Sequence, residues 1–376
     1  MSTKRRVKSA SQKIISELLQ FNDNAFSCGT QLGEVTSVSG AIQYDLAEME
    51  KRLRVYVDKG RVTGGVEVKE EPIIATRPDE SLIKPLNKVK RHAGGFLAVD
   101  CSTRTLKRAN NWGVYLMRAA YAAVKERDVD WGYNERVCTV VGDAHVRRSF
   151  LQDFRIEMES QIALDLLSGK VSMPHYVHSD VRSMYLLLDG GGYFGGDRKF
   201  RVSLYEKCEQ ENINLLAISK NSPSLHDEKG RDFIATTYNM ASFDTWVYHP
   251  VRKADKDKSL YGDISVVKLC GESFRVFRCD IMEYLTSSDV SELLAPLTCI
   301  SEDPRCVGYP IALWLAHEFS APSDPMLLSY HDQVEEGLKT AGLLEALRRE
   351  ELCCSFADEL HGIKRAFEWE WWDGQI

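Results

Sequence analysis

Two aspartates stand where short apolar runs end. Asp100 follows the run FLAV, and Asp189 follows the run LLL. A carboxylate beside an apolar core is costly to desolvate unless a cation or a hydrogen-bond donor meets it. If both strand ends lie side by side in one sheet, their oxygens form the ligand set that a hard divalent cation prefers. The alternative is that each aspartate only caps the turn after its strand.

A tyrosine and a histidine bracket another apolar segment, YPIALWLAH, which spans residues 309–317. Tyr309 and His317 are just over two helical turns apart, so their side chains point within roughly 80° of each other on a helix. Such a pair could flank a phosphate. The alternative is a histidine that is hydrogen-bonded inside the core.

Two further charged residues are candidates for the same chemistry. Lys220 ends the run NLLAIS, where it could neutralise charge that develops on a phosphate, although a lysine at a strand end usually only reaches water. Glu159 lies on the helix expected over 147–168, together with Glu157 and Asp165. Each of these three acids could also be an ordinary exposed helix charge.

The elements that would position these residues follow from periodicity. Short apolar runs closed by turns predict buried strands, and a stripe at helical spacing predicts a helix that packs on the sheet. Three strands, then helix, strand, helix and strand, is the order of an RNase H-like α/β core, a mixed sheet flanked by helices. The expected strands cover 95–103, 112–124, 136–144, 183–192 and 214–220, and the helices cover 147–168 and 200–211, although 202–209 could also be a strand.

Helical additions are expected on both sides of this core. Three regions follow: 1–93 with N-terminal helices and an insertion, 94–320 as the domain with the RNase H-like core, and 321–376 as a helical extension. The remaining predicted elements are helices at 10–22, 44–58 and 309–320, a loop or small insertion over 59–92, a hairpin of 264–271 with 273–282, and a helical tail over 331–376 with aromatic residues at 367–372.

Composition bounds the possible partners. The 376 residues carry a net charge of −7, so the chain has no global electrostatic footprint for nucleic acid. A local basic groove is the alternative to scattered solvated charge. The start lacks an apolar signal segment, and no run approaches the roughly 18 apolar residues of a membrane span, so a cytoplasmic protein is expected. The candidate groove residues are Arg104, Lys107, Arg108, Arg147, Arg148, Arg198, Lys199 and Arg201.

Several common motifs are missing. There is no G-x-x-x-x-G-K-[ST] loop, so the chain is not expected to hydrolyse ATP by itself. The segment GGGYFG at 190–195 fits G-x-G-x-x-G, but GGDRK follows where a helix should begin, which favours a plain glycine turn. The ten cysteines contain no C-x-x-C pair and indicate reduced, mostly buried thiols.

Six short segments in this order resemble the NurA nuclease family. Each is weak alone, but together they span residues 94–320. Cys101 stands where the family usually has glycine, and Gly191 stands where it usually has serine. The segments are LAVDCS with Asp100, MESQIAL with Glu159, LLLDGGG with Asp189, AISK with Lys220, FRCD with Asp280, and YPIALWLAHE with Tyr309 and His317.

The resemblance implies a deoxyribonuclease that depends on one or two Mn²⁺ or Mg²⁺ ions. Asp100, Glu159 and Asp189 would bind the metal, and Lys220, Tyr309 and His317 would contact the phosphate. It also implies a 5′-to-3′ exonuclease that can cut single strands, works as a homodimer and docks on a HerA-like hexameric ATPase, in DNA end processing and repair or in antiphage defence.

Two other functions stay open. The chain could be a catalytically silent adaptor that clamps a hexameric ATPase on DNA, which would predict a lost metal ligand. It could also be another RNase H-like nuclease, a resolvase or a hybrid nuclease, which a panel of substrates would separate.

Overall fold

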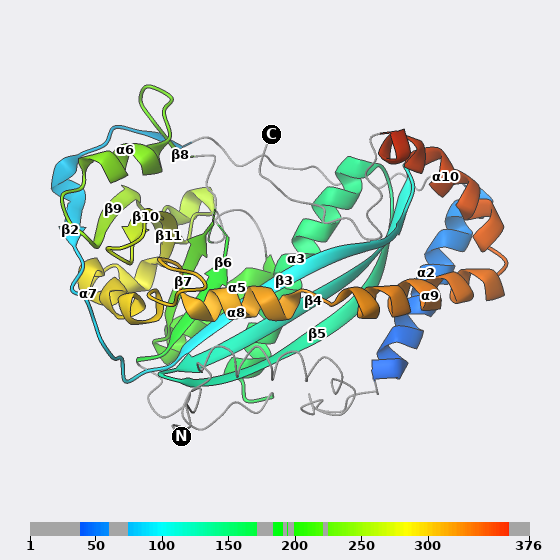
Figure 1. Ribbon diagram of the computed structural model, residues 1–376, viewed down its shortest axis with the longest axis horizontal. Helices are drawn as coiled ribbons and strands as arrows, with labels where there is room; N and C mark the ends of the chain where they lie inside the picture. The colour runs from blue at the N-terminus through cyan, green and yellow to red at the C-terminus, as the bar shows by residue number, and fades with distance from the viewer. Residues whose placement is uncertain are drawn as a thin grey trace, which may run out of the picture.

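The computed structural model describes residues 38–59, 74–170, 183–190, 194, 199–220 and 225–360 (Figure 1). The helix predicted at 10–22 and the aromatic residues at 367–372 lie outside these ranges. Among the helices in these ranges, none is long and apolar enough to cross a membrane.

One mixed sheet of nine strands organises the chain, in the order β2-β9-β10-β11-β7-β6-β3-β4-β5. The predicted meander is confirmed: β3, β4 and β5 pair antiparallel, and β6 and β7 continue the sheet parallel to β3. With α3 after β5 and α5 between β6 and β7, this part is an RNase H-like core. Its bounds are β3 (Phe96–Arg108), β4 (Trp112–Lys125), β5 (Asp128–Val141), α3 (Ala144–Leu167), β6 (Tyr185–Asp189), α5 (Lys199–Glu211) and β7 (Asn214–Ser219).

Four more strands extend the sheet beyond β7. The predicted hairpin is confirmed as β10 and β11, and β11 pairs antiparallel with β7. β9 was not predicted, and it carries β2 on its outer side. The bounds are β2 (Ile83–Pro85), α6 (Phe233–Met240), β9 (Trp246–Arg252), β10 (Gly262–Lys268), β11 (Phe277–Met282) and α7 (Val290–Leu294), and a separate two-stranded sheet joins β1 (Ile74–Thr76) to β8 (Leu225–Asp227).

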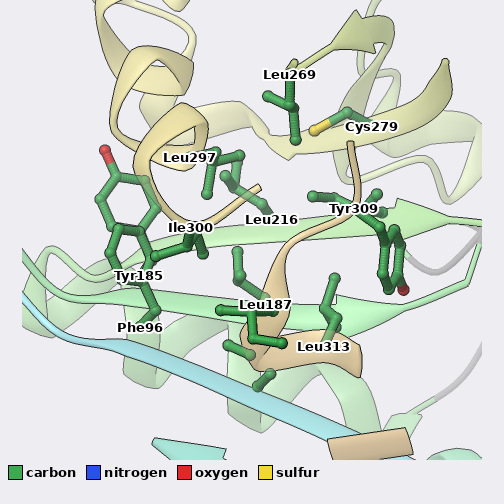
Figure 2. Close-up of a cluster of buried hydrophobic side chains, with 14 of the residues drawn as sticks. Phe96, Tyr185, Leu187, Leu216, Leu269, Cys279, Leu297, Ile300, Tyr309 and Leu313 are labelled. Atoms are coloured by element: carbon green, nitrogen blue, oxygen red, sulfur yellow. The ribbon is translucent and has the colours of Figure 1, made fainter. Parts of the chain in front are cut away.

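Strand alternation divides the core between the two faces of the sheet. In β6, Leu186 and Leu188 pack toward α3 and α5, whereas Leu187 packs toward α8 (Ile311–Ser320) on the other face. Figure 2 shows the second cluster, in which Leu187 lies near Leu313 of α8. A run such as YLLL is therefore apolar on both sides, which is why it reads as a buried strand.

Helices α2 (Val38–Lys59), α9 (Asp324–Thr340) and α10 (Leu344–Leu360) gather at the end of the long strands opposite to β9–β11 (Figure 1). Their apolar faces enclose Trp112 of β4 with Leu53 and Leu338. The helix predicted over 44–58 and the described part of the helical tail are confirmed.

Three of the cations considered for a local basic groove are not on the surface. Arg104, Lys107 and Arg147 are buried. Lys107 Nζ pairs with Glu335 at 2.8 Å, and Arg147 donates to backbone carbonyls. Neither a basic groove nor scattered solvated charge, the two alternatives from the sequence, therefore describes these three residues. The side chains of 198, 199 and 201 lie outside the described part of the chain.

Candidate active site

The two aspartates lie side by side, although only Asp189 ends its strand, because β3 continues past Asp100 to Arg108. Val99 of β3 pairs in parallel with Leu188 of β6, so Asp100 and Asp189 are the next residues on neighbouring strands. Alternation puts both carboxylates on the face that α8 covers. Lys220 follows β7 directly, in the next strand along the same edge.

Tyr309 and the helix α8 that follows it lie over Asp189 and Asp100 on one face of the sheet. Tyr309 donates its hydroxyl to Asp189 Oδ1 at 3.2 Å, and His317 Nδ1 lies 2.7 Å from Asp100 Oδ2 in a hydrogen bond. In Figure 2, Tyr309 stands at the border of the apolar cluster with its hydroxyl directed away from the leucines. Helix α8 packs on β3 and β4, which fixes Tyr309 and His317 beside the two aspartates.

Asp100, Asp189 and His317 form the one group of metal-ligand donors found among the described residues. One donor atom from each lies within 4.8 Å of the other two. Two carboxylates and an imidazole suit a divalent cation that accepts oxygen and nitrogen ligands.

The positive charge of Lys220 offsets part of the repulsion between the two aspartate carboxylates. Lys220 Nζ lies 2.6 Å from Asp189 Oδ2. Burial raises the pKa of Asp100, but the hydrogen bond of His317 and the charge of Lys220 outweigh burial and lower that pKa to about 2. Burial raises the pKa of Asp189, and Lys220 offsets only part of this effect. At neutral pH the Asp100 carboxylate is therefore ionised.

Glu159 is outside this group of donors. It is buried in α3, and its Oε1 lies 3.6 Å from Arg155 Nε, one helical turn earlier. The negative charges of Glu159, Asp100 and Asp189 raise the pKa of Arg155, and Glu159 has the largest effect of the three. Sequence reasoning missed Arg155, although its i, i+4 spacing to Glu159 on the predicted helix was the available signal. Metal binding by Glu159 stays a prediction.

Asp280 of the FRCD segment has a different environment. It accepts two hydrogen bonds from Arg278 of the same strand, at 2.7 and 2.9 Å, and both residues are almost fully buried. A bidentate pair of this kind is a structural contact within β11. The structure does not place Asp280 with the donor group.

A cavity of about 760 Å³ opens beside the donors. Lys220, Tyr309 and His317 line it, together with residues of α6, the β10–β11 connection and the segment before α8. The candidate site therefore has room for a ligand that is larger than a metal ion.

No family model matches the sequence, and no curated protein matches it. Solved structures do. A NurA nuclease from Sulfolobus solfataricus is 15% identical with a TM-score of 0.49, over 88% of this chain and 98% of that one. NurA bound to dAMP and manganese is 9% identical with a TM-score of 0.42, over 78% of this chain and 95% of that one. The chain is similar in fold to NurA nucleases. At these identities the similarity concerns the fold alone, so function is proposed below from the residues of this chain.

Proposed function

We propose that this chain is a metal-dependent nuclease that hydrolyses phosphodiester bonds in DNA. One observation carries the proposal: Asp100 and Asp189, on the neighbouring strands β3 and β6, share a 4.8 Å donor group with His317. Lys220 and Tyr309 both contact Asp189 and line the cavity.

The donor set fits Mn²⁺ or Mg²⁺. Asp100 and Asp189 would hold one or two ions, with Glu159 as a third carboxylate. When bound, the metal supplies a water of lowered pKa and neutralises negative charge at the phosphate. The pKa of Asp100, about 2, keeps that carboxylate ionised for this role.

The protein's own residues orient the substrate. We assign the Lys220 ammonium and the Tyr309 hydroxyl to the phosphate oxygens, which carry more charge in the transition state than in the ground state, because both residues line the cavity beside Asp189. The hydrogen bond to Asp100 fixes the His317 ring through Nδ1. That leaves Nε2 as the atom that donates a proton near the leaving oxygen.

The finer assignments extend this proposal. They are 5′-to-3′ exonuclease action, single-strand cutting, a homodimer and a HerA-like ATPase partner, with a role in DNA repair or antiphage defence. They rest on the resemblance in sequence segments. Against a silent adaptor, all the charged residues of the proposed site are present.

Chelation gives the direct test. The purified chain is expected to digest linear duplex and single-stranded DNA in Mn²⁺ and to lose this activity in EDTA, because no side chain in the site replaces the metal-bound water. Product release is followed on labelled DNA, and Mn²⁺ added in excess of EDTA should restore it. Equal digestion in EDTA and in Mn²⁺ would overturn the metal-dependent mechanism.

Replacing Tyr309 by Phe removes one donor to Asp189 and keeps the ring in the apolar cluster. A hydrogen bond to a charged group contributes about 1.5 to 3 kcal/mol, so DNA hydrolysis is expected to fall roughly tenfold or more. The measurement is kcat/KM on a single-stranded substrate. Tyr284→Phe is the matched control, because it removes a hydroxyl that donates to Ile213 O and does not line the cavity, so it should change hydrolysis little.

A further inference from the structure

Aromatic side chains line the same cavity as Lys220, Tyr309 and His317. Phe274, in the β10–β11 connection, leaves 87% of its surface exposed. Tyr238 of α6 and Trp314 of α8 are both half-buried. Three rings from three separate segments thus border the cavity that Tyr309 and His317 also line.

The exposed ring is carried by an anchored loop. On one side of Phe274, the Ser273 hydroxyl donates to Val307 O at 3.1 Å, and on the other, the Arg275 amide donates to Ser273 Oγ at 3.0 Å. Gly308 has a φ of +89°, and a Cβ there would collide with Ser273 Oγ. A glycine at this position lets the two loops approach closely. Exposure of Phe274 is therefore built into a fixed backbone.

Positive charge accompanies the rings. Arg275 is exposed, and its guanidinium donates to the carbonyl of Val307 at 3.3 Å. Arg305 lies with its Cζ 4.9 Å from the centre of the Trp314 ring, and Asp303 balances its charge. The acid on α6, Asp232, caps that helix by accepting from the Ala235 amide. Arginine and aromatic side chains therefore line the same cavity as Lys220.

We propose that this cavity binds unpaired bases of single-stranded DNA next to the phosphate that is cut. Bases stack on Phe274, and Arg275 contacts the backbone. Aromatic side chains with adjacent cations bind single strands in this way, with about 1 to 3 kcal/mol per stacked base. A base inside a duplex is stacked on its neighbours, so only an unpaired or extruded base reaches the cavity. This inference rests on the proposed nuclease function for the position of the cut phosphate.

Binding without cleavage tests the cavity. Fluorescein-labelled oligo(dT) is titrated with the full chain in EDTA, and anisotropy gives Kd. Phe274→Ala is expected to weaken binding about tenfold, the factor that corresponds to 1.4 kcal/mol, whereas Phe274→Trp should bind as well as the wild type. Phe243→Ala is the matched control, because Phe243 is 42% exposed and does not line the cavity.

A second substrate separates this inference from the proposed function. An oligonucleotide of abasic (tetrahydrofuran) residues keeps the phosphodiester backbone but has no aromatic ring, so Phe274→Ala should hydrolyse it at the wild-type rate in Mn²⁺ while losing activity on oligo(dT). Absence of all hydrolysis by the wild type would overturn the nuclease proposal. If the wild type hydrolyses oligo(dT), the nuclease proposal stands. The base site alone is then overturned if Phe274→Ala and Phe243→Ala bind oligo(dT) with equal affinity, or if the wild type does not bind oligo(dT) in EDTA.

Discussion

Replacement of Asp189 by Asn is expected to reduce DNA hydrolysis by about a hundredfold to a thousandfold, the loss typical of removing a group that stabilises transition-state charge. Asn keeps the shape of the side chain but removes the negative charge that faces Lys220 at 2.6 Å. It also removes one of the two carboxylates in the donor group. Asp100→Asn should have the same effect, because it weakens both the metal site and the contact to His317.

The control for this prediction is Asp165→Asn on α3. Asp165 accepts from Gln161 and Lys170 near the surface, outside the donor group. Cleavage of labelled single-stranded DNA in saturating Mn²⁺ is measured for each variant, and thermal unfolding verifies that the fold is kept. Wild-type rates for Asp100→Asn or Asp189→Asn would contradict the assignment of the site.

Removal of the Asp280 carboxylate should instead damage the fold. Asp280→Ala deprives a buried guanidinium, that of Arg278, of two hydrogen bonds in the interior of the sheet. Breaking a buried pair on one side typically costs about 3 to 5 kcal/mol. The free energy of unfolding in urea is the measurement.

A double replacement tests the reason for that loss. Arg278→Met with Asp280→Leu removes both charges and keeps the volume, so it should recover much of the stability. If Asp280→Ala unfolds like the wild type but loses nuclease activity, Asp280 belongs to the site and the structural role is wrong.

The core strands and the paired aspartates could be predicted because their signals are local. The apolar runs FLAV and YLLL are each buried on both faces and are followed by a carboxylate, which few positions in a sheet tolerate. β9 was missed because TWVYHPVR interrupts its apolar residues with a histidine and a proline. The start of β5 was missed although Val129, Trp131 and Tyr133 alternate with polar residues, which is the pattern of a half-buried strand.

The remaining parts of the site depend on packing that is distant in sequence. Arg155 of α3 feels the charges of Glu159 and of the two aspartates because α3 packs on β3 and β4. Phe274, Trp314 and Tyr238 line one cavity from three segments whose relative positions no spacing rule predicts. The sequence could therefore predict Asp100, Asp189 and His317, which form the donor group, but not the three rings that line the cavity beside it.

The pairing of β2 with β9 has a consequence for how the protein is made. Ile83 lies opposite Tyr248, and the whole RNase H-like core is synthesised between them. A ribosome releases β2 long before its partner exists, so the outer edge of the sheet closes late. Because such distant contacts form slowly, this edge should be the last part to gain protection from hydrogen exchange during refolding.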